Sequence, residues 1–439
     1  MRDAGYRGSG GHMLQKSLKW MILTLCLAGL LIGGAVWLVG KLSTPAIAPQ
    51  PSPTLSAAPT VAPTPAATPS PSPTPTPSPT PAPVTEADRL AAYIAGMSTE
   101  EKLGQLVMFG GSGTSSMSDE FLDILQTYRV GNVVLYGANI DRSASDGGFA
   151  RAARLTDWLQ TQRTGEPPLL IGIDVEGGEV VRFTWDKWPS SARTLGRNND
   201  RDAAYDQFLK IGRTLLDTGI QMNLAPVLDV APDPMDTFLG TRIISSDPDV
   251  VSNIGTAIIE ALHDAGCLST AKHFPGHGGT TADSHQSTPV VNASAESLRG
   301  YDLVPFAAAV DAGVDVVLVA HILYPALDAD NIVTLSPAIM TGLLRDELGF
   351  DGVVMSDDFR MGGLTAQCAA GEAAVRFLLA GGDLILCGPQ HGRQREIMEA
   401  LYQAAADGTL SEARIDESVT RILQKKMQVT GWSPAAPEG

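Results

Sequence analysis

Eight short apolar runs alternate with amphipathic segments along residues 86–439, and this alternation limits the possible folds more than any other feature of the chain. A parallel sheet that is covered by helices on both faces requires such near-continuous apolar strands. The predicted strands are residues 103–110, 130–137, 169–176, 220–230, 268–274, 314–321, 351–358 and 382–388. The predicted helices between them include residues 119–129, 202–219, 250–266 and 336–349. The pattern predicts an α/β fold, either a (β/α)8 TIM-type barrel or a doubly wound open sheet.

Polar side chains at the carboxyl ends of these runs distinguish between the two folds. In a barrel these ends converge on one face, which carries the active site, whereas in an open sheet they lie along an edge. The polar residues at the strand ends are Asp174, Asp229, Lys272, His273, His321 and Asp357. Because these residue types suit one shared site, we favour the barrel.

Residues 18–40, LKWMILTLCLAGLLIGGAVWLVG, form an apolar stretch that is long enough to span a bilayer as a helix. Lysines flank both of its ends, and the next basic residue along the chain is Arg89. The positive-inside rule therefore predicts a single-pass anchor in the cell membrane, with residues 1–17 in the cytoplasm and the remainder extracellular. The alternative is a cleaved signal peptide and a secreted protein, for which AIA at residues 46–48 offers a cleavage site.

Residues 41–85 form a linker that is rich in proline, serine and threonine. Residues 42–85 carry no charge and contain 15 of the chain's 30 prolines. This composition cannot build a core and favours extended polyproline II structure. We therefore expect a disordered stalk between the anchor and a single folded domain, residues 86–439.

The part of the chain beyond the predicted anchor is strongly acidic. The net charge is −17 overall, and since residues 1–41 carry a net +4, the remainder carries −21. A surface of this sign disfavours nucleic acid as a partner. The cysteines of this part are Cys267, Cys368 and Cys387, which lie in or beside apolar runs without a C-x-x-C spacing. They are expected to be buried free thiols.

Two of the predicted strands end in acidic motifs. VVMSDDF places Asp357 and Asp358 after an apolar strand, where a carboxylate can act as a nucleophile, a general base or a metal ligand. A helix N-cap or a salt bridge is the alternative for this pair. IGIDVEGGEVVRF places Asp174 and Arg182 around a Gly-Gly pair. These side chains can bond sugar hydroxyls, a carbonyl or an anion, with simple turn chemistry as the alternative.

The stretch AKHFPGHGGTTADSH gathers Lys272, His273, His277, Asp283 and His285, and so holds three of the chain's seven histidines. A metal site would need imidazoles on one face, but a Pro-Gly pair interrupts any helix here and no H-E-x-x-H pattern occurs. In a proton-transfer site, Asp283 would orient the His285 imidazole while Lys272 and His273 contact substrate. We favour proton transfer over a metal site or a merely polar loop, and expect His277 to shape the loop.

Taken together, the motifs KHFPGHG, DSH, IDVEGG, APVLDV and SDD resemble those of glycoside hydrolase family 3, and more narrowly its single-domain β-N-acetylhexosaminidases. The resemblance spans about residues 90–430. It implies a retaining double displacement without metal or cofactor, in which Asp357 is the nucleophile and His285, supported by Asp283, is the general acid and base. The resemblance also assigns sugar binding to Asp174, Arg182, Arg242, Lys272 and His273.

The implied activity is exo-acting release of terminal N-acetylglucosamine from wall-derived muropeptides or chitin-type oligosaccharides. The alternatives are a β-glucosidase or β-xylosidase of the same family, a non-catalytic glycan-binding protein on a stalk, a metal-dependent hydrolase, and a phosphorolytic enzyme. The glucosidases and xylosidases usually take their acid/base carboxyl from a second domain, so the DSH motif favours the hexosaminidase. Two positions depart from the family pattern and leave the subsite preference open: Glu179 stands where arginine is usual, and Arg360 where serine is usual.

Overall fold

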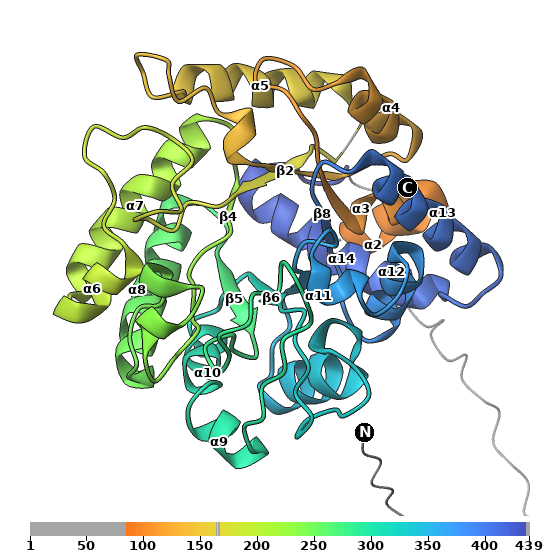
Figure 1. Ribbon diagram of the computed structural model, residues 1–439. Helices are drawn as coiled ribbons and strands as arrows, with labels where there is room; N and C mark the ends of the chain where they lie inside the picture. The colour runs from red at the N-terminus through yellow and green to blue at the C-terminus, as the bar shows by residue number, and fades with distance from the viewer. Residues whose placement is uncertain (1–84, 164, 166, 436–439) are drawn as a thin grey trace, which may run out of the picture. The chain divides into compact units, whose positions relative to one another are not determined.

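The structure is a computed structural model that describes residues 85–163, 165 and 167–435 (Figure 1). The predicted cytoplasmic segment, the predicted anchor at residues 18–40 and nearly all of the predicted linker lie outside the described residues. Among the helices of the described part, none is both long and apolar enough to cross a membrane.

Eight short strands form at the centre of the described chain, each inside one of the predicted apolar runs. They are β1 (Val107–Gly110), β2 (Asn132–Leu135), β3 (Leu170–Ile173), β4 (Met222–Asn223), β5 (Thr270–Phe274), β6 (Val316–Val319), β7 (Val353–Ser356) and β8 (Ile385–Cys387). Every residue of these strands is buried. All the pairings between them are parallel, which confirms the predicted parallel α/β architecture.

The strands pair as two sheets, in the orders β4-β3-β2-β1-β8 and β5-β6-β7. Isolated parallel bridges link the two sheets at both edges: Met222 with Leu268 and Val227 with Lys272 at one edge, and Met355 with Leu384 at the other. Strand β4 is much shorter than the predicted run because the Ala225 N–H bonds back to the carbonyl of Asn223 at 2.8 Å, and the following Pro226 has no N–H to donate. The observed pairing is therefore two parallel sheets joined by bridges and not one continuous ladder.

Helices connect the strands and lie around them in Figure 1. The α-helices are α2 (Glu86–Gly96), α3 (Thr99–Gln105), α4 (Asp119–Thr127), α5 (Phe149–Gln162), α6 (Ala192–Asn198), α7 (Arg201–Asp217), α8 (Pro248–Ala265), α9 (Ala295–Gly300), α10 (Val304–Asp311), α11 (Gly362–Thr365), α12 (Ala370–Leu379), α13 (His391–Ala406) and α14 (Glu412–Thr430). The short 3-10 turns are η1 (Gly137–Asn139), η2 (Pro234–Asp236), η3 (Gly240–Arg242) and η4 (Val333–Leu335).

Three of the four predicted helices form as α4, α7 and α8, whereas the fourth is the π-helix η5 (Ala338–Glu347). Helix α8 shows how the sequence sets such boundaries. The side chain of Asp247 accepts the N–H of Asp249 at its start, and Pro248 occupies the first turn, where a missing N–H costs nothing. Gly266, with a φ of 86°, ends the helix in the left-handed conformation that glycine adopts without strain.

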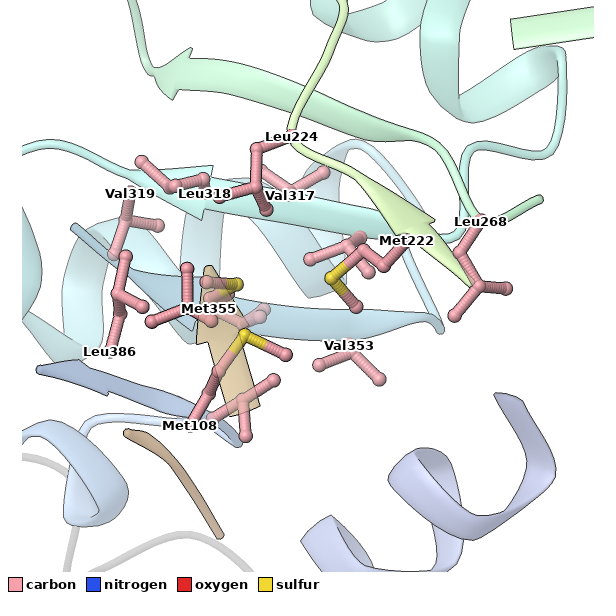
Figure 2. Packing of buried hydrophobic residues seen from close by; sticks show 14 of the residues in the cluster. Met108, Met222, Leu224, Leu268, Val317, Leu318, Val319, Val353, Met355 and Leu386 are labelled. Carbon is pink, nitrogen blue, oxygen red and sulfur yellow. The ribbon is translucent and has the colours of Figure 1, made fainter. Parts of the chain in front are cut away.

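The space between the strands is filled by apolar side chains. Figure 2 shows Met108, Met222 and Met355, from β1, β4 and β7, within one apolar cluster. These methionines are at most 1% exposed. A Cβ placed on Gly172 of β3 would lie 3.5 Å from the Met222 sulfur and from the terminal methyl of Met108, so these methionines pack next to the glycine. Because the apolar interior is packed, the polar residues Lys272 and His273 of β5 and Asp357 after β7 lie at the carboxyl ends of the strands.

Candidate active site at the carboxyl ends of the strands

A cavity of about 510 Å³ opens where the strands end, and the segments after β2, β3, β5 and β7 all contribute to it. Seven of the eight predicted site residues line this cavity. They are Asp174, Arg182, Arg242, Lys272, His273, His285 and Asp357. The eighth, Asp283, contacts one of them and is described below. The structure therefore brings together residues that lie up to 183 positions apart in the sequence.

One wall of the cavity is a ladder of alternating charges. Lys272 Nζ lies 2.7 Å from Asp174 Oδ1 and 2.6 Å from Glu176 Oε1. Arg182 Nη2 lies 3.2 Å from the other oxygen of Asp174. Arg242 donates to Glu176 from Nε at 2.8 Å and from Nη2 at 3.0 Å. Three cations thus share two carboxylates, so this wall carries one excess positive charge.

Mutual attraction keeps the groups of this charge ladder ionised despite their burial. Burial alone would raise the pKa of Asp174, but Lys272 and Arg182 outweigh it and hold the pKa well below its usual range. Burial likewise opposes ionisation of Glu176, and Lys272 and Arg242 lower its pKa overall. Burial would lower the pKa of Lys272, but the two carboxylates raise it. Ordered, ionised donors and acceptors of this kind are well suited to bind the hydroxyl groups of a sugar.

A second buried network fixes the start of the histidine-rich loop. Asp229 is fully buried and accepts hydrogen bonds from the backbone N–H of His277 at 2.6 Å and that of His273 at 3.2 Å. Its Oδ2 atom also lies 2.7 Å from His273 Nδ1. Burial would raise the pKa of Asp229, but the two histidines lower it. Asp229 therefore orients the His273 ring toward the cavity and ties both histidines to one carboxylate.

His277 is held inside the loop. Its Nε2 atom lies 3.0 Å from the hydroxyl of Ser284, and the ring of Phe238 packs edge-on against it with centroids 4.7 Å apart. Burial lowers the pKa of His277 to about 4, so the imidazole is neutral at working pH. The structure thus shows the contacts expected of a loop-shaping residue. Among the described residues, no group of three or more histidine, cysteine, aspartate or glutamate side chains is arranged to hold a metal ion.

The two adjacent aspartates after β7 have different surroundings. Asp358 is bound by Arg360 through Nε at 3.0 Å and Nη2 at 2.6 Å, by the Tyr136 hydroxyl at 2.8 Å and by the Gly388 N–H at 3.2 Å. Burial would raise the pKa of Asp358, but Arg360 lowers it. Asp357 is half-buried, and its Oδ1 atom accepts the N–H of Asp358 at 2.8 Å. Both aspartates line the cavity, and the Asp358 carboxylate is occupied by Arg360, Tyr136 and the Gly388 N–H, so Asp357 is the less constrained of the two.

Asp283 and His285 form the predicted dyad. His285 Nδ1 lies 2.7 Å from Asp283 Oδ1, which also accepts the backbone N–H of His285 at 2.9 Å. Burial would raise the pKa of Asp283, but the hydrogen bonds from His285 lower it. When Nδ1 carries the proton bonded to Asp283, the Nε2 atom is the position that exchanges protons with a ligand. The side chain of His285 is 62% exposed and lines the same cavity as Asp357.

The sequence placed Asp229 at the site face without a role and gave no role to Glu176 or Tyr136, although each shapes the site. The spacing of Asp174 and Glu176 was an available signal, because residues two apart in an extended segment point to the same face. The ion-pair partner of Arg242 was not predicted either. This residue was predicted to contact sugar, and the structure pairs it bidentately with Glu176 while keeping it at the cavity wall. Glu179, the first departure from the family pattern, lies close to the cavity wall. Its Oε1 atom accepts a hydrogen bond at 2.8 Å from Thr241, the neighbour of Arg242.

Arg360, the second departure, is packed as part of the wall. Its guanidinium carbon lies 5.1 Å from the centre of the Tyr136 ring, and a Cβ on Gly388 would come within 2.2 Å of it. The guanidinium therefore contacts the Tyr136 ring, the bare backbone of Gly388 and the Asp358 carboxylate. Only a glycine at position 388 leaves room for this arrangement.

Comparisons with known proteins agree with the geometry. Beta-hexosaminidase A of Pseudoalteromonas piscicida is 30% identical over 388 residues, which cover 79% of this chain and 64% of that protein. Beta-hexosaminidase LpqI of Mycobacterium tuberculosis is 32% identical over 342 residues, which cover 75% of this chain and 83% of that protein. A solved glycoside hydrolase family 3 beta-N-acetylglucosaminidase from Paenibacillus sp. aligns with a TM-score of 0.73 at 36% identity, covering 78% of this chain and 65% of that one.

This chain thus spans just under two thirds of the length of the Pseudoalteromonas and Paenibacillus proteins. Its own sequence matches the Glycosyl hydrolase family 3 N terminal domain over residues 98–425, which is most of the part that the structure describes. This match includes every residue of the predicted site and confirms the resemblance found in the motifs. The chain belongs to glycosyl hydrolase family 3.

Proposed function

We propose that this chain is an exo-acting retaining β-N-acetylhexosaminidase that releases terminal N-acetylglucosamine from wall-derived muropeptides or chitin-type oligosaccharides. The observation that carries the proposal is the pairing of Asp357, whose neighbour Asp358 takes the structural contacts, with the Asp283–His285 dyad at one cavity. Two of the relatives above are named beta-hexosaminidases, and the solved Paenibacillus structure is named a beta-N-acetylglucosaminidase. These names support the choice of sugar.

In the proposed first step, the Asp357 carboxylate attacks the anomeric carbon of the terminal sugar. The bond from that carbon to the leaving-group oxygen breaks, and His285 transfers its Nε2 proton to this oxygen. In the second step, His285 removes a proton from water, and the water oxygen attacks the same carbon and displaces the carboxylate. Asp283 keeps its negative charge throughout and holds the imidazole in the tautomer that each step needs.

The charge ladder would bind the sugar that reacts. Asp174 and Glu176 offer carboxylate oxygens as acceptors, while Lys272, Arg182 and Arg242 offer donors. Because these groups already bind each other, little rearrangement is needed when hydroxyl groups replace solvent at their free positions. His273, oriented by Asp229, would add one further donor or acceptor.

The remaining sequence predictions enter as parts of the same proposal. We interpret the two sheets as one (β/α)8 barrel, because backbone hydrogen bonds join both gaps: the Asn223 N–H bonds to the carbonyl of Leu268 at 3.0 Å, and the Ser356 N–H to that of Leu384 at 3.0 Å. We also propose that residues 18–40 anchor the chain in the cell membrane, that residues 41–85 form the stalk, and that residues 86–439 act outside the cell.

Hydrolysis of p-nitrophenyl N-acetyl-β-glucosaminide and of the matching β-glucoside by the full chain tests the proposal, with Asp357→Ala as the control. Preferential cleavage of the N-acetylglucosaminide that is lost in the variant is the expected result. Preferential cleavage of the glucoside would make the chain a β-glucosidase instead. A folded protein that cleaves neither sugar would contradict a glycosidase and favour a glycan-binding role.

A further inference from the structure

The loop that carries the dyad is hydrogen-bonded to the short segment that follows the Asp357 strand. The N–H of Gly362 donates to the carbonyl of His285 at 3.0 Å, and the N–H of Gly363 donates to that of Ser284 at 2.8 Å. The Thr288 hydroxyl donates to the carbonyl of Gly363 at 2.8 Å, and Gln367 Nε2 donates to that hydroxyl at 2.9 Å. Four bonds thus join residues 284–288 to residues 362–367, and we call this set the loop clamp.

The loop clamp requires glycine at two successive positions. A Cβ on Gly362 would lie 2.6 Å from the carbonyl carbon and oxygen of Gln286 and 2.9 Å from the carbonyl oxygen of His285. A Cβ on Gly363 would lie 2.8 Å from the carbonyl oxygen of His321 and 3.1 Å from that of Ser284. The obstructing atoms are backbone, so they cannot swing aside as a side chain would. A larger residue at Gly362 would push directly against the loop, and one at Gly363 would press first on His321 and then on the Ser284 carbonyl of the loop.

The opposite side of the loop is also anchored. Ser284, whose carbonyl accepts the Gly363 N–H, bonds through its hydroxyl to His277 at 3.0 Å. His277 is in turn tied by its own N–H to Asp229. Phe238 packs against His277 and against His285, with ring centroids 4.7 and 6.4 Å apart. The clamp is therefore the second of two attachments, and it is the one that leads to the nucleophile strand.

We propose that the loop clamp is a positioning device which sets the place of His285 relative to Asp357. The proposal rests on the proposed function, since it assigns the two residues as acid/base and nucleophile. Only four residues separate Asp357 from Gly362, so the clamp fixes both groups to one short piece of backbone. The side chain of His285 is largely exposed and packs only lightly, which leaves its position dependent on hydrogen bonds made by the loop backbone. Positioning a proton donor in this way sharply affects the efficiency of proton transfer.

The dependence of kcat/KM on the leaving group tests this role. A 2,4-dinitrophenyl leaving group departs without a proton, whereas a methylumbelliferyl or alkyl group needs one from His285. In Gly363→Ala, we expect kcat/KM to fall about 100-fold with the alkyl N-acetyl-β-glucosaminide and about threefold or less with the dinitrophenyl one. In Thr288→Val, which keeps the shape of the side chain and removes two of the four clamp bonds, we expect falls of about 5-fold and less than twofold.

Matched variants separate positioning from general damage to the fold. Gly392→Ala adds the same methyl group in α13, where nothing lies within 4 Å, and Thr214→Val removes a hydroxyl that bonds only to Lys210 of its own helix. Both are expected to resemble the wild type with both substrates. Equal falls with the two leaving groups, or no fall in either clamp variant, would overturn the inference. Thr288→Val decides the matter if Gly363→Ala does not fold. An inactive wild type would overturn the proposed function and the inference with it.

Discussion

The backbone N–H of Asp358 donates to the carboxylate of Asp357 at 2.8 Å, so Asp358 helps to orient the proposed nucleophile. We expect Asp357→Asn to lower kcat at least about 1000-fold without changing Tm, because the amide cannot act as the nucleophile. Asp358→Asn should instead lower the free energy of unfolding by about 1–3 kcal/mol, since Arg360 and the Tyr136 hydroxyl lose a charged partner. Kinetics and thermal melts of the two variants provide the comparison. A large loss of Tm in Asp357→Asn would show that the roles are assigned the wrong way round.

Lys272 holds Asp174 and Glu176 in one buried cluster, and its removal should be costly. Lys272→Met leaves two nearby carboxylates without their shared cation, and we expect the free energy of unfolding at pH 7 to fall by about 3–5 kcal/mol. The folded-state pKa values of both carboxyls are lowered, so their stabilising contribution is present above the ordinary pKa and is lost as the pH falls. The deficit of the variant should therefore persist down to the ordinary pKa values of 3.8 and 4.5, and it should be smaller at pH 2 than at pH 7. Urea titrations at both values measure it, and a deficit that does not depend on pH would exclude this electrostatic origin.

The sequence predicted the location of the site better than the ion pairs and hydrogen bonds within it. Parallel strands bring their carboxyl ends together, so the motifs containing Asp174, Lys272 and Asp357 could be placed at one face from the apolar runs alone. The partner of Arg242 could not be predicted in the same way. Its pairing with Glu176 depends on how η3 packs against the segment after β3, and local patterns do not specify distances between such loops. The break between β4 and β5 could not be predicted for a similar reason, because it follows from a local turn at Ala225.

Asp302 makes the stability of the loop region depend on pH. Burial, together with repulsion from Asp229, raises the pKa of Asp302 to about 7. Because this folded-state pKa lies above the ordinary value of 3.8, the native state binds the proton more tightly, and stability is lost as the pH rises toward and past 7. His277 has the opposite sign, since its folded-state pKa of about 4 makes stability rise between about pH 4 and pH 6.5.

We therefore expect Asp302→Asn to become more stable relative to the wild type as the pH increases. The difference in the free energy of unfolding should grow by about 1–3 kcal/mol between pH 5 and pH 8. Denaturant titrations of both proteins across this range measure the difference. If it stays constant, Asp302 is ionised in the folded protein throughout and its burial is less severe than the structure indicates.

In the proposed mechanism Asp283 acts through His285, so its replacement should affect the chemistry far more than the fold. In Asp283→Asn, the amide occupies the same space but no longer carries the charge that stabilises the imidazolium, and its NH2 group can turn toward Nδ1 and favour the wrong tautomer. We expect kcat/KM with an alkyl N-acetyl-β-glucosaminide to fall about 10- to 100-fold. The value with a dinitrophenyl leaving group should change little, because that group departs without a proton. Asp283 lies at the surface of the loop, so Tm should remain within a few degrees of the wild type. If both substrates were affected equally at an unchanged Tm, Asp283 would have to contact the sugar directly and not only support the acid/base.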